Sequence, residues 1–431
     1  MARSSDRPKR LRGDDGRSKV YPLLVVVWLV LTAVVVVAIV GSHWWHQQGP
    51  LNTFNPKGTN ARKIQDLVTP VFVTAGFVFV VVEGLILGLV IKNRKKDDDD
   101  EFPGQGHGSN TLEIVWTAIP FFVLFFIAVK AVPVIFQLED FKHTDMQVRV
   151  EGQQWWWQFK YDNNGDGKYG GSGDIVTANE LVIPAGENVQ MHITSNDVIH
   201  SFWIPSLNGK RDAVPGFTSS WKMQADKPGR YRGQCTEFCG LSHGRMQMYV
   251  IALPKAQYEA WVANQLKAAV EKTRADFSSV DDWNKYEAGR TLFKTTCTAC
   301  HTINGLGHPP GGVAAQVSGQ APRLTHLMSR DVFAGSTLAL YLGVQDTLAG
   351  DTPVTNYLDK AYVDGKTVPD VNNLRNWLQN PSSIKPMAPN PVVPNPHPGP
   401  KRPPTVGRGM PNLNLTQDQM SQLIAYLTTL K

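Results

Sequence analysis

The stretch CTEFCGLSHGRM, residues 235–246, decides how the rest of the chain is interpreted, because it gathers two cysteines, a histidine and a methionine. A second motif, CTACH at residues 297–301, holds the remaining two cysteines. Thiolates are soft ligands suited to copper, and imidazole and thioether groups complete a copper site. Two thiols separated by two residues and followed by histidine are the pattern of covalent haem attachment. The motifs predict a copper site and a c-type haem on one chain, with electrons passing from one to the other.

Each motif has a competing interpretation. The Cys-x3-Cys pair could bind zinc, but a thioether such as that of Met246 is not a usual zinc ligand. A disulfide between Cys235 and Cys239 is the interpretation without a metal. Cys297 and Cys300 could form a thioredoxin-type redox pair, but no βαβ pattern surrounds them and a histidine follows directly. Copper and haem are therefore favoured.

The charge distribution points to a membrane. The chain has 431 residues, enough for two or three domains, and a formal net charge of +6. Its basic residues gather within residues 3–19 and again within residues 92–96, and both clusters flank apolar runs. Such clusters orient membrane helices, and no nucleic-acid motif accompanies them. We expect membrane partners and no nucleic acid.

Three apolar runs, at residues 21–40, 67–91 and 114–136, are about long enough to cross ~30 Å of hydrocarbon. Buried core helices are shorter and less apolar. A cleaved signal peptide is the alternative for the first run, but its apolar stretch exceeds the usual ~7–15 residues and no Ala-x-Ala site follows. We expect a transmembrane helix or uncleaved signal anchor over 21–41 and a transmembrane helix hairpin over 67–136.

The positive-inside rule sets the topology. Residues 1–20 form a basic cytoplasmic tail, and the cluster at residues 92–96 is cytoplasmic as well. Everything from about residue 137 onward then lies outside, where haem c is attached and copper is available. We expect a multi-pass protein of the bacterial cell membrane, with both soluble domains on its outer side.

The pattern after residue 142 predicts two soluble domains. Apolar and polar residues alternate in several short runs separated by turns, which predicts an all-β sandwich or barrel over 142–256. These runs lie at residues 147–150, 180–183, 189–194, 221–223 and 246–251. Residues 257–281 are assigned to a linker, although residues 258–270 have a helical pattern, and 282–431 to an all-α domain. Its last helix is predicted at 416–430, where Thr416 and Gln419 form a capping box.

Three polar features of the sequence need separate interpretation. Glu83 lies inside the second apolar run, where it could serve a proton path or a subunit contact, or stay protonated beside a neighbouring helix. Glu113 precedes the third run, where the helix dipole favours a carboxylate. Residues 162–167 open like a calcium loop, but Gly173 stands where the twelfth-position glutamate is expected. We interpret this segment as a hairpin loop, with calcium as the alternative.

From about residue 67 to residue 253 the chain resembles subunit II of cytochrome c oxidase. The resemblance rests on His200, the block 235–246 and residues 201–217. It implies a cupredoxin barrel that holds a binuclear CuA centre, bridged by the two thiolates of the motif. The implied copper ligands are His200, Cys235, Glu237 through its backbone carbonyl, Cys239, His243 and Met246. The Glu237 carboxylate would reach a magnesium or manganese ion at the border with subunit I.

The resemblance also implies roles for residues around this centre. Trp155 would be the point at which electrons arrive from cytochrome c, although tryptophan clusters are more often core or interface packing. Glu113 matches the glutamate at the cytoplasmic entrance of a proton channel into subunit I. Asp197 and Asp212 match acidic positions near the docking surface for cytochrome c, or are ordinary loop residues.

The C-terminal part resembles a class I cytochrome c. Cys297 and Cys300 would bind the haem covalently, and His301 would coordinate its iron. Pro322 resembles the proline that supports this histidine. The sixth iron ligand should be a methionine, which raises the haem potential relative to two histidines and suits a donor that feeds copper.

Two methionines compete for the sixth position. Met410 is the expected ligand, because it precedes the helix that resembles the C-terminal helix of these cytochromes. Met387 is the alternative, because a Pro-rich insert separates the two and blurs the register.

The whole chain resembles a subunit II with a fused C-terminal cytochrome c, as in caa-type haem-copper oxidases. The resemblance implies electron transfer from cytochrome c or another external donor, through haem c and CuA, to subunit I with its haem a and CuB. Subunit III would be a further partner. Oxygen would be reduced to water in subunit I, coupled to proton pumping. A CuA-containing nitric oxide reductase is the alternative enzyme, and a copper-carrying assembly protein is the alternative without catalysis.

Overall fold

The computed structural model describes residues 25–34, 51–93, 108–142, 144–171, 173–304, 306, 321–342, 344, 368–394 and 405–431. The chain divides into two compact units. One contains Met1–His46 and Asp66–Ala131, and the other contains Gln47–Gln65 and Val132–Lys431. The basic tail expected at residues 1–20 lies outside the described residues, as does most of the cytoplasmic cluster expected at 92–96.

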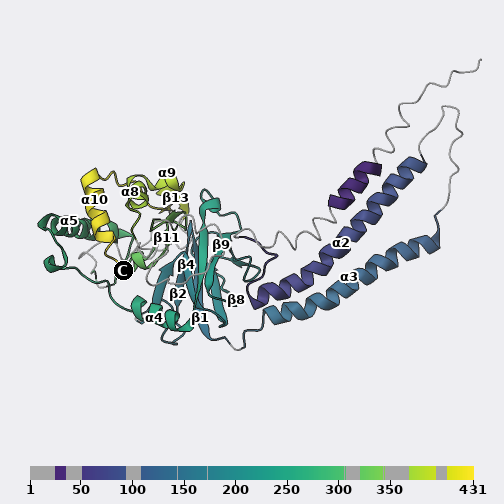
Figure 1. Ribbon diagram of the computed structural model, residues 1–431, viewed down its shortest axis with the longest axis horizontal. Helices are drawn as coiled ribbons and strands as arrows, with labels where there is room; N and C mark the ends of the chain where they lie inside the picture. The colour runs from purple at the N-terminus through teal and green to yellow at the C-terminus, as the bar shows by residue number, and fades with distance from the viewer. Residues whose placement is uncertain are drawn as a thin grey trace, which may run out of the picture. The chain divides into compact units, whose positions relative to one another are not determined.

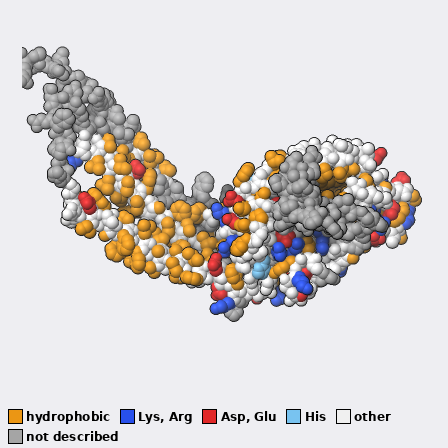
Figure 2. Space-filling model, turned by 180° about the vertical axis from the view of Figure 1, so that it is seen from behind, with side chains coloured by type: hydrophobic (Ala, Val, Ile, Leu, Met, Phe, Trp, Pro, Cys, Tyr) orange, Lys and Arg blue, Asp and Glu red, His pale blue; other side chains and the backbone are white. Residues whose placement is uncertain are grey.

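The first unit is built from apolar helices. Two are long and apolar enough to cross a membrane, α2 (Thr59–Lys92) and α3 (Asn110–Leu138), and the most apolar window of each is 0% buried. Figure 2 shows hydrophobic side chains gathered over these helices. Phe77 on α2, for example, is 69% exposed. Continuous apolar surface of this length is suited to lipid.

The structure covers the expected membrane segments unevenly. The two long helices cover the hairpin expected over 67–136. The run at 21–40 is described only as the helix Val25–Val34, and its remainder lies outside the described residues.

α2 begins at Thr59, before the apolar run itself, and its residues up to Gln65 belong to the second unit. Asn60 and Ala61 are buried there, and Nδ2 of Asn60 donates to the carbonyl of Lys222 at 2.8 Å. Arg62 forms an ion pair with Asp226. Apolar periodicity cannot reveal such a polar helical start, since the contacts that stabilise it come from distant residues.

The second unit contains a sandwich of two five-stranded sheets, ordered β3-β2-β1-β5-β8 and β4-β10-β9-β6-β7 (Figure 1). On β5, Val189, Met191 and Ile193 are fully buried, as the period-two pattern requires. The predicted all-β sandwich is confirmed. Its strands are β1 (Met146–Gln153), β2 (Trp156–Tyr161), β3 (Ile175–Ala178), β4 (Glu180–Pro184), β5 (Val189–Ser195), β6 (His200–Trp203), β7 (Lys210–Ala213), β8 (Ser219–Met223), β9 (Gly229–Cys235) and β10 (Gln247–Leu253).

The segment expected as a linker, 257–281, is partly helical. α4 (Lys255–Gln265) follows β10 and covers its first part. Trp261 on α4 is 1% exposed, and its ring lies 5.4 Å from that of Tyr161 on β2. The short 3-10 helix η3 (Arg274–Asp276) follows. Aromatic packing therefore holds the start of this segment on the sandwich.

The remaining residues form the C-terminal domain. α5 (Val280–Thr296) packs against α10 (Gln417–Leu427), and the rings of Phe293 and Tyr426 lie 5.4 Å apart between them. The predicted capping box of Thr416 and Gln419 is confirmed. The other elements are η4 (Cys297–Ala299), η5 (Leu327–Ser329), β11 (Val332–Phe333), β12 (Leu338–Ala339), α8 (Val371–Gln379), α9 (Pro381–Ile384), β13 (Ala388–Pro394) and β14 (Thr405–Arg408).

Candidate metal and haem sites

Two thiols form the centre of the candidate copper site. Cys235 is the last residue of β9, and Cys239 lies in the loop that leads to η2 (His243–Arg245). Each residue is 3% exposed, and their sulfur atoms lie 3.8 Å apart. A disulfide requires about 2.05 Å between the sulfurs. The structure therefore has two free, buried cysteines at this place.

Four further donor groups surround the thiols. Nδ1 of His200 lies 3.8 Å from Sγ of Cys235, and Nδ1 of His243 lies 3.6 Å from Sγ of Cys239. Sδ of Met246 lies 3.8 Å from the second sulfur. The backbone oxygen of Glu237 lies 3.3 Å from the first. Thiolates, imidazoles and a thioether suit copper better than harder metals.

Backbone pairing brings these residues together from separate parts of the sequence. The amide of Cys235 donates to the carbonyl of Met246 at 2.9 Å, so β9 and the start of β10 close the ligand loop. The amide of Thr236 donates to the carbonyl of Ser201 at 3.1 Å, next to His200. The sandwich thus fixes the positions of the ligands at its edge.

The electrostatic surroundings favour the ionised form of one of the two thiols, that of Cys235. A hydrogen bond with Cys239, supported by His200, lowers the pKa of Cys235 to about 4. The same sulfur–sulfur contact raises the pKa of Cys239 above that of an ordinary thiol. Burial would lower the pKa of His200, but Asp197 and Cys235 outweigh it, so the pKa of the imidazole is raised.

Asp197 is buried beside His200. It is only 8% exposed, and its carboxylate lies 2.8 Å from Nε2 of His200 and accepts the amide of Gln154 at 2.7 Å. A buried carboxylate on the far nitrogen of a candidate ligand orients the ring and leaves Nδ1 toward the sulfur. Asp197 is therefore a positioning residue in this chain, whereas Asp212 on β7 is exposed.

Trp155 lies against the ligand loop. Its Nε1 donates to the carbonyl of Cys239 at 2.9 Å, and Nε2 of Gln154 donates to the same oxygen at 2.8 Å. Trp155 is 4% exposed. It therefore belongs to the buried surroundings of the thiols and does not present an open surface.

The haem motif begins where α5 ends. Cys297 and Cys300 lie on and directly after η4, both free and partly buried, and His301 follows. Nδ1 of His301 lies 2.8 Å from the carbonyl of Pro322, as expected from the resemblance. This bond fixes the tautomer and leaves Nε2 as the free donor for a metal. Burial lowers the pKa of His301, which keeps the ring neutral and able to ligate iron.

Met410 and Met387 lie next to each other. A Cβ added at Gly409, directly before Met410, would collide with the side chain of Met387. Both methionines are partly buried against the core. The structure therefore brings both candidates to one place and does not separate them.

Several buried charged residues outside the predicted set join the sandwich to the C-terminal domain. Lys385 is 3% exposed, and its ammonium donates to the carbonyl of Trp155. Burial lowers its pKa to about 7. Arg230 and Asp331, each 1% exposed, form an ion pair between the sandwich and the C-terminal domain. No local pattern marks these residues, since a single charged residue in a sequence is usually solvated.

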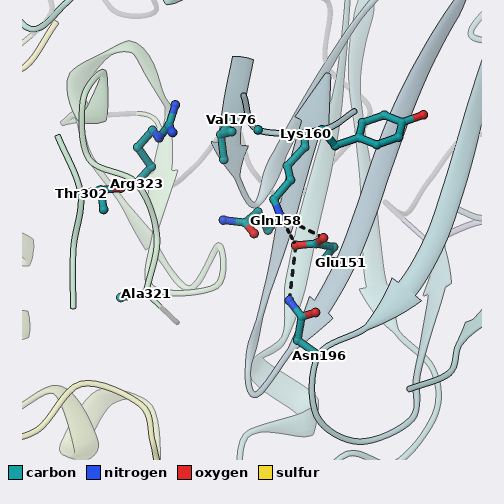
Figure 3. A pocket seen from close by; sticks show the side chains of 10 residues that line it. Glu151, Gln158, Lys160, Val176, Asn196, Thr302, Ala321 and Arg323 are labelled. Atoms are coloured by element: carbon teal, nitrogen blue, oxygen red, sulfur yellow. Dashed lines mark hydrogen bonds and ion pairs between the residues drawn. The ribbon is translucent and has the colours of Figure 1, made fainter. Parts of the chain in front are cut away.

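A cavity of about 250 Å³ lies near the haem motif, lined by Thr302 and Arg323 on one side and by Glu151 and Lys160 on the other (Figure 3). Nζ of Lys160 lies 2.9 Å from Glu151, and Asn196 donates to the same carboxylate at 3.3 Å. These groups bond mainly to one another, so the cavity offers no ligand set comparable to the thiol site.

The remaining predicted residues lie on the two long helices and in loops of the sandwich. Glu113 is exposed in the first turn of α3, and Glu83 lies on α2. Residues 162–167 join β2 to its antiparallel neighbour β3, which confirms the hairpin interpretation. The Glu237 side chain is exposed. Among described residues, a group of three His, Cys, Asp or Glu side chains that could hold a metal consists of His200, Cys235 and Cys239.

Comparisons with known families cover nearly the whole chain. The family described as cytochrome C oxidase subunit II, periplasmic domain, matches residues 146–253, and its transmembrane domain matches residues 45–134. Cytochrome c matches residues 286–431.

Curated relatives extend the match over most of the chain. Cytochrome c oxidase subunit 2 of Alkalihalophilus pseudofirmus is 31% identical, over 88% of this chain and 91% of that protein. The subunit of the same name from Bacillus sp. (strain PS3) is 28% identical, over 78% of this chain and 79% of that protein. A solved periplasmic domain of subunit II of cytochrome oxidase from Bradyrhizobium japonicum is 27% identical, covering 28% of this chain and 94% of that chain, with a TM-score of 0.26.

The match to subunit 2 includes both membrane helices and the β-sandwich that carries the six donor groups, and the cytochrome c match includes the haem motif. The relative from Alkalihalophilus pseudofirmus spans all three parts at once. This chain belongs to the cytochrome c oxidase subunit 2 family and carries a cytochrome c domain in its C-terminal part.

Proposed function

We propose that this chain is the subunit of a haem-copper terminal oxidase through which electrons reach subunit I, where oxygen is reduced to water and protons are pumped. External cytochrome c or another donor would reduce a covalent haem c on Cys297 and Cys300. A binuclear CuA centre would then pass the electrons to subunit I. Bound copper and haem would supply one-electron redox couples.

The observation that carries this proposal is the convergence of six soft or oxygen donors on one edge of the sandwich. His200 and Cys235 would hold one side, and Cys239, His243 and Met246 the other, with the Glu237 carbonyl between them. Two thiolates close together, each facing an imidazole, suit a pair of soft ions better than a single zinc.

We propose further roles for individual residues. Asp197 would orient His200. Trp155 would pass electrons to the copper centre, since its indole N–H donates to the carbonyl of Cys239. His301 and Met410 would take the two axial positions of the haem iron. Glu237 would offer its exposed carboxylate to a magnesium or manganese ion, with subunit I as the source of the remaining ligands. Glu113, on the first turn of α3, would lie at the mouth of a proton channel in subunit I.

The orientation in the membrane follows from the same assignment. α2 and α3 would span the bacterial cell membrane, and residues 21–41 would form a further span. Both soluble domains would lie on the outer side. This chain is also similar to quinol oxidase subunit 2 of Bacillus cereus, which is 29% identical over 53% of this chain and 78% of that protein. The copper donor set of this chain favours a cytochrome-type donor over quinol.

The proposal can be tested on the complex purified from membranes through a C-terminal tag and reconstituted in proteoliposomes. We expect oxygen uptake with outward proton release, and loss of both in Cys235→Ser, because the bridging thiolate is gone. Turnover of nitric oxide without pumping would instead place the chain in a nitric oxide reductase. Transfer of copper to a partner protein, without turnover of either gas, would favour an assembly protein.

A further inference from the structure

The C-terminal domain lies directly on the ligand loop of the sandwich. The amide of Gln247 donates to the carbonyl of Gly335 at 3.1 Å, and Oγ1 of Thr337 donates to the carbonyl of Arg245 at 3.4 Å. Gly335 and Thr337 belong to the turn between β11 and β12. Arg245 and Gln247 flank Met246, so this turn holds the backbone on both sides of a candidate copper ligand.

The turn is shaped for close backbone approach. Gly335 has a φ of +68°, a conformation that side chains rarely adopt. A Cβ added there would lie 2.9 Å from the carbonyl oxygen of Trp155 and 3.0 Å from that of Arg245. Both distances are shorter than ordinary van der Waals contact. The turn therefore reaches the sandwich as bare backbone, without room for a side chain.

Lys385 closes the same contact from a second segment of the C-terminal domain. Its buried ammonium donates to the carbonyl of Trp155 and, at 3.3 Å, to that of Ala334 in the turn. The next residue, Pro386, accepts the hydroxyl of Ser242 at 2.5 Å through its carbonyl. A buried charged group is costly unless it is hydrogen-bonded, so these partners define where Lys385 can lie.

A buried polar network extends this interface along the sandwich. The ion pair between Arg230 and Asp331 joins β9 to the residue before β11. Oε1 of Glu180 on β4 accepts the amides of Asp331 at 2.6 Å and Val332 at 2.9 Å. A domain that only visits its partner is expected to meet it through an exposed, hydrated surface. The ionic groups at this contact are buried instead, and separating the domains would break the pair.

Trp155 takes part in this contact through its backbone carbonyl. Its indole N–H bonds to the ligand loop at Cys239, and its carbonyl is capped by Lys385 and approached by Gly335. At 4% exposure it offers almost no surface to a soluble protein. The residue proposed to receive electrons thus touches the C-terminal domain through its backbone, and its buried side chain lies against the ligand loop.

We propose that the C-terminal domain is fixed on the sandwich by Lys385 and the β11–β12 turn, so that a soluble donor is excluded from Trp155 and can reduce only the C-terminal haem. This proposal rests on the proposed function and adds a single obligatory order of reduction. Lys385 is a positioning residue in it, because it touches neither a metal nor a donor.

Enclosure can be measured without turnover, by hydroxyl-radical footprinting of the purified complex and of the metal-free chain. In the unmodified protein Trp155 should be oxidised about as slowly as the fully buried Trp157, the internal reference. Lys385→Met and Gly335→Ala should each raise the rate at Trp155 about tenfold, since the contact opens locally. Rapid oxidation of Trp155 in the unmodified protein, or no change in both variants, would overturn the proposal.

Matched controls separate undocking from general strain. Gly165 has a φ of +71°, close to that of Gly335, but a Cβ there meets nothing within 4 Å. Gly165→Ala therefore carries the same backbone strain without the collision. Lys255 pairs with Glu187 at the surface, 72% exposed, so Lys255→Met removes a lysine away from the contact. Both controls should leave the oxidation rate of Trp155 unchanged.

The order in which haem and copper are reduced is a second test, made on the unmodified complex. After rapid mixing with reduced soluble cytochrome c, the haem c absorbance should change first, and copper should follow with the same final rate at every donor concentration. Direct reduction of copper before haem would overturn the enclosure of Trp155. Absence of copper or haem would overturn the proposed function instead, so the two failures are distinguishable.

Discussion

Gly152 on β1 shows how one residue controls the candidate copper site. A Cβ at this position would lie 2.7 Å from Cδ2 of His200 and 3.0 Å from its Cγ. The imidazole packs against the strand at the one point that has no side chain. Glycine is unfavourable in a strand interior, and here the close approach of the ring explains its presence.

We expect Gly152→Ala to displace His200 and lower the copper content of the purified chain severalfold, measured by elemental analysis. Gly244 lies beside His243, and a Cβ there meets nothing within 4 Å. Gly244→Ala is thus a matched control that should retain its copper. Full copper in Gly152→Ala would show that the ring does not need this position.

The axial methionine of the haem is a second question at the scale of single residues. Met410→Ala should convert the haem to a high-spin or misligated spectrum, because a thioether ligand is lost. Met387→Ala should leave the low-spin spectrum intact. If instead Met387→Ala changes the spectrum and Met410→Ala does not, the assignment of the ligand is reversed. The measurement is visible absorption of the oxidised and reduced protein.

Among the elements, the crossing of α5 and α10 shapes the C-terminal domain. A Cβ at Gly289 of α5 would collide with the backbone carbonyl of Gln422, and lie 3.1 Å from the amide nitrogen of Leu423. The two helices therefore touch through their backbones at this point, flanked by the rings of Tyr286, Phe293 and Tyr426.

The sign of a mutational effect tests this crossing. Alanine inside a helix is more stable than glycine by about 0.5–1 kcal/mol when space allows. Gly289→Ala should instead lower the stability of the domain by about 1–3 kcal/mol, because the helices must separate. Thermal loss of the haem absorbance in the solubilised complex measures it. A higher transition temperature for the variant would contradict the contact.

At the scale of the whole molecule, the ion pair between Arg230 and Asp331 joins the two soluble domains. Both side chains are 1% exposed. Removing one partner leaves the other charge buried, which typically costs about 3–5 kcal/mol. We expect Asp331→Ala to lower the thermal stability of the complex by that order.

A surface pair provides the comparison. Arg62 and Asp226 have exposed side chains, at 45% and 28%, and exposed pairs contribute about 1 kcal/mol or less. Asp226→Ala should therefore have a small effect, measured by the same unfolding curves. Equal losses in the two variants would mean that the buried pair does not hold the domains together.

The sequence predicted the parts of this molecule that are set by local pattern. Apolar length gave α2 and α3, the period of two gave strands such as β5, and Thr416 with Gln419 gave the start of α10. The donors in residues 235–246 could be grouped because they are close in the sequence. The position of the C-terminal domain could not be predicted, because Lys385 and Asp331 contact residues more than a hundred positions away in the sequence.

The central claim is that this chain carries a binuclear copper centre and a covalent haem. It is tested most directly by measuring copper and iron in the purified full-length chain, before and after denaturation. We expect copper and iron in a ratio of about 2 to 1, with the haem retained on the denatured chain and the copper released. Zinc or a single copper at the thiol site, or haem that is lost on denaturation, would contradict the claim.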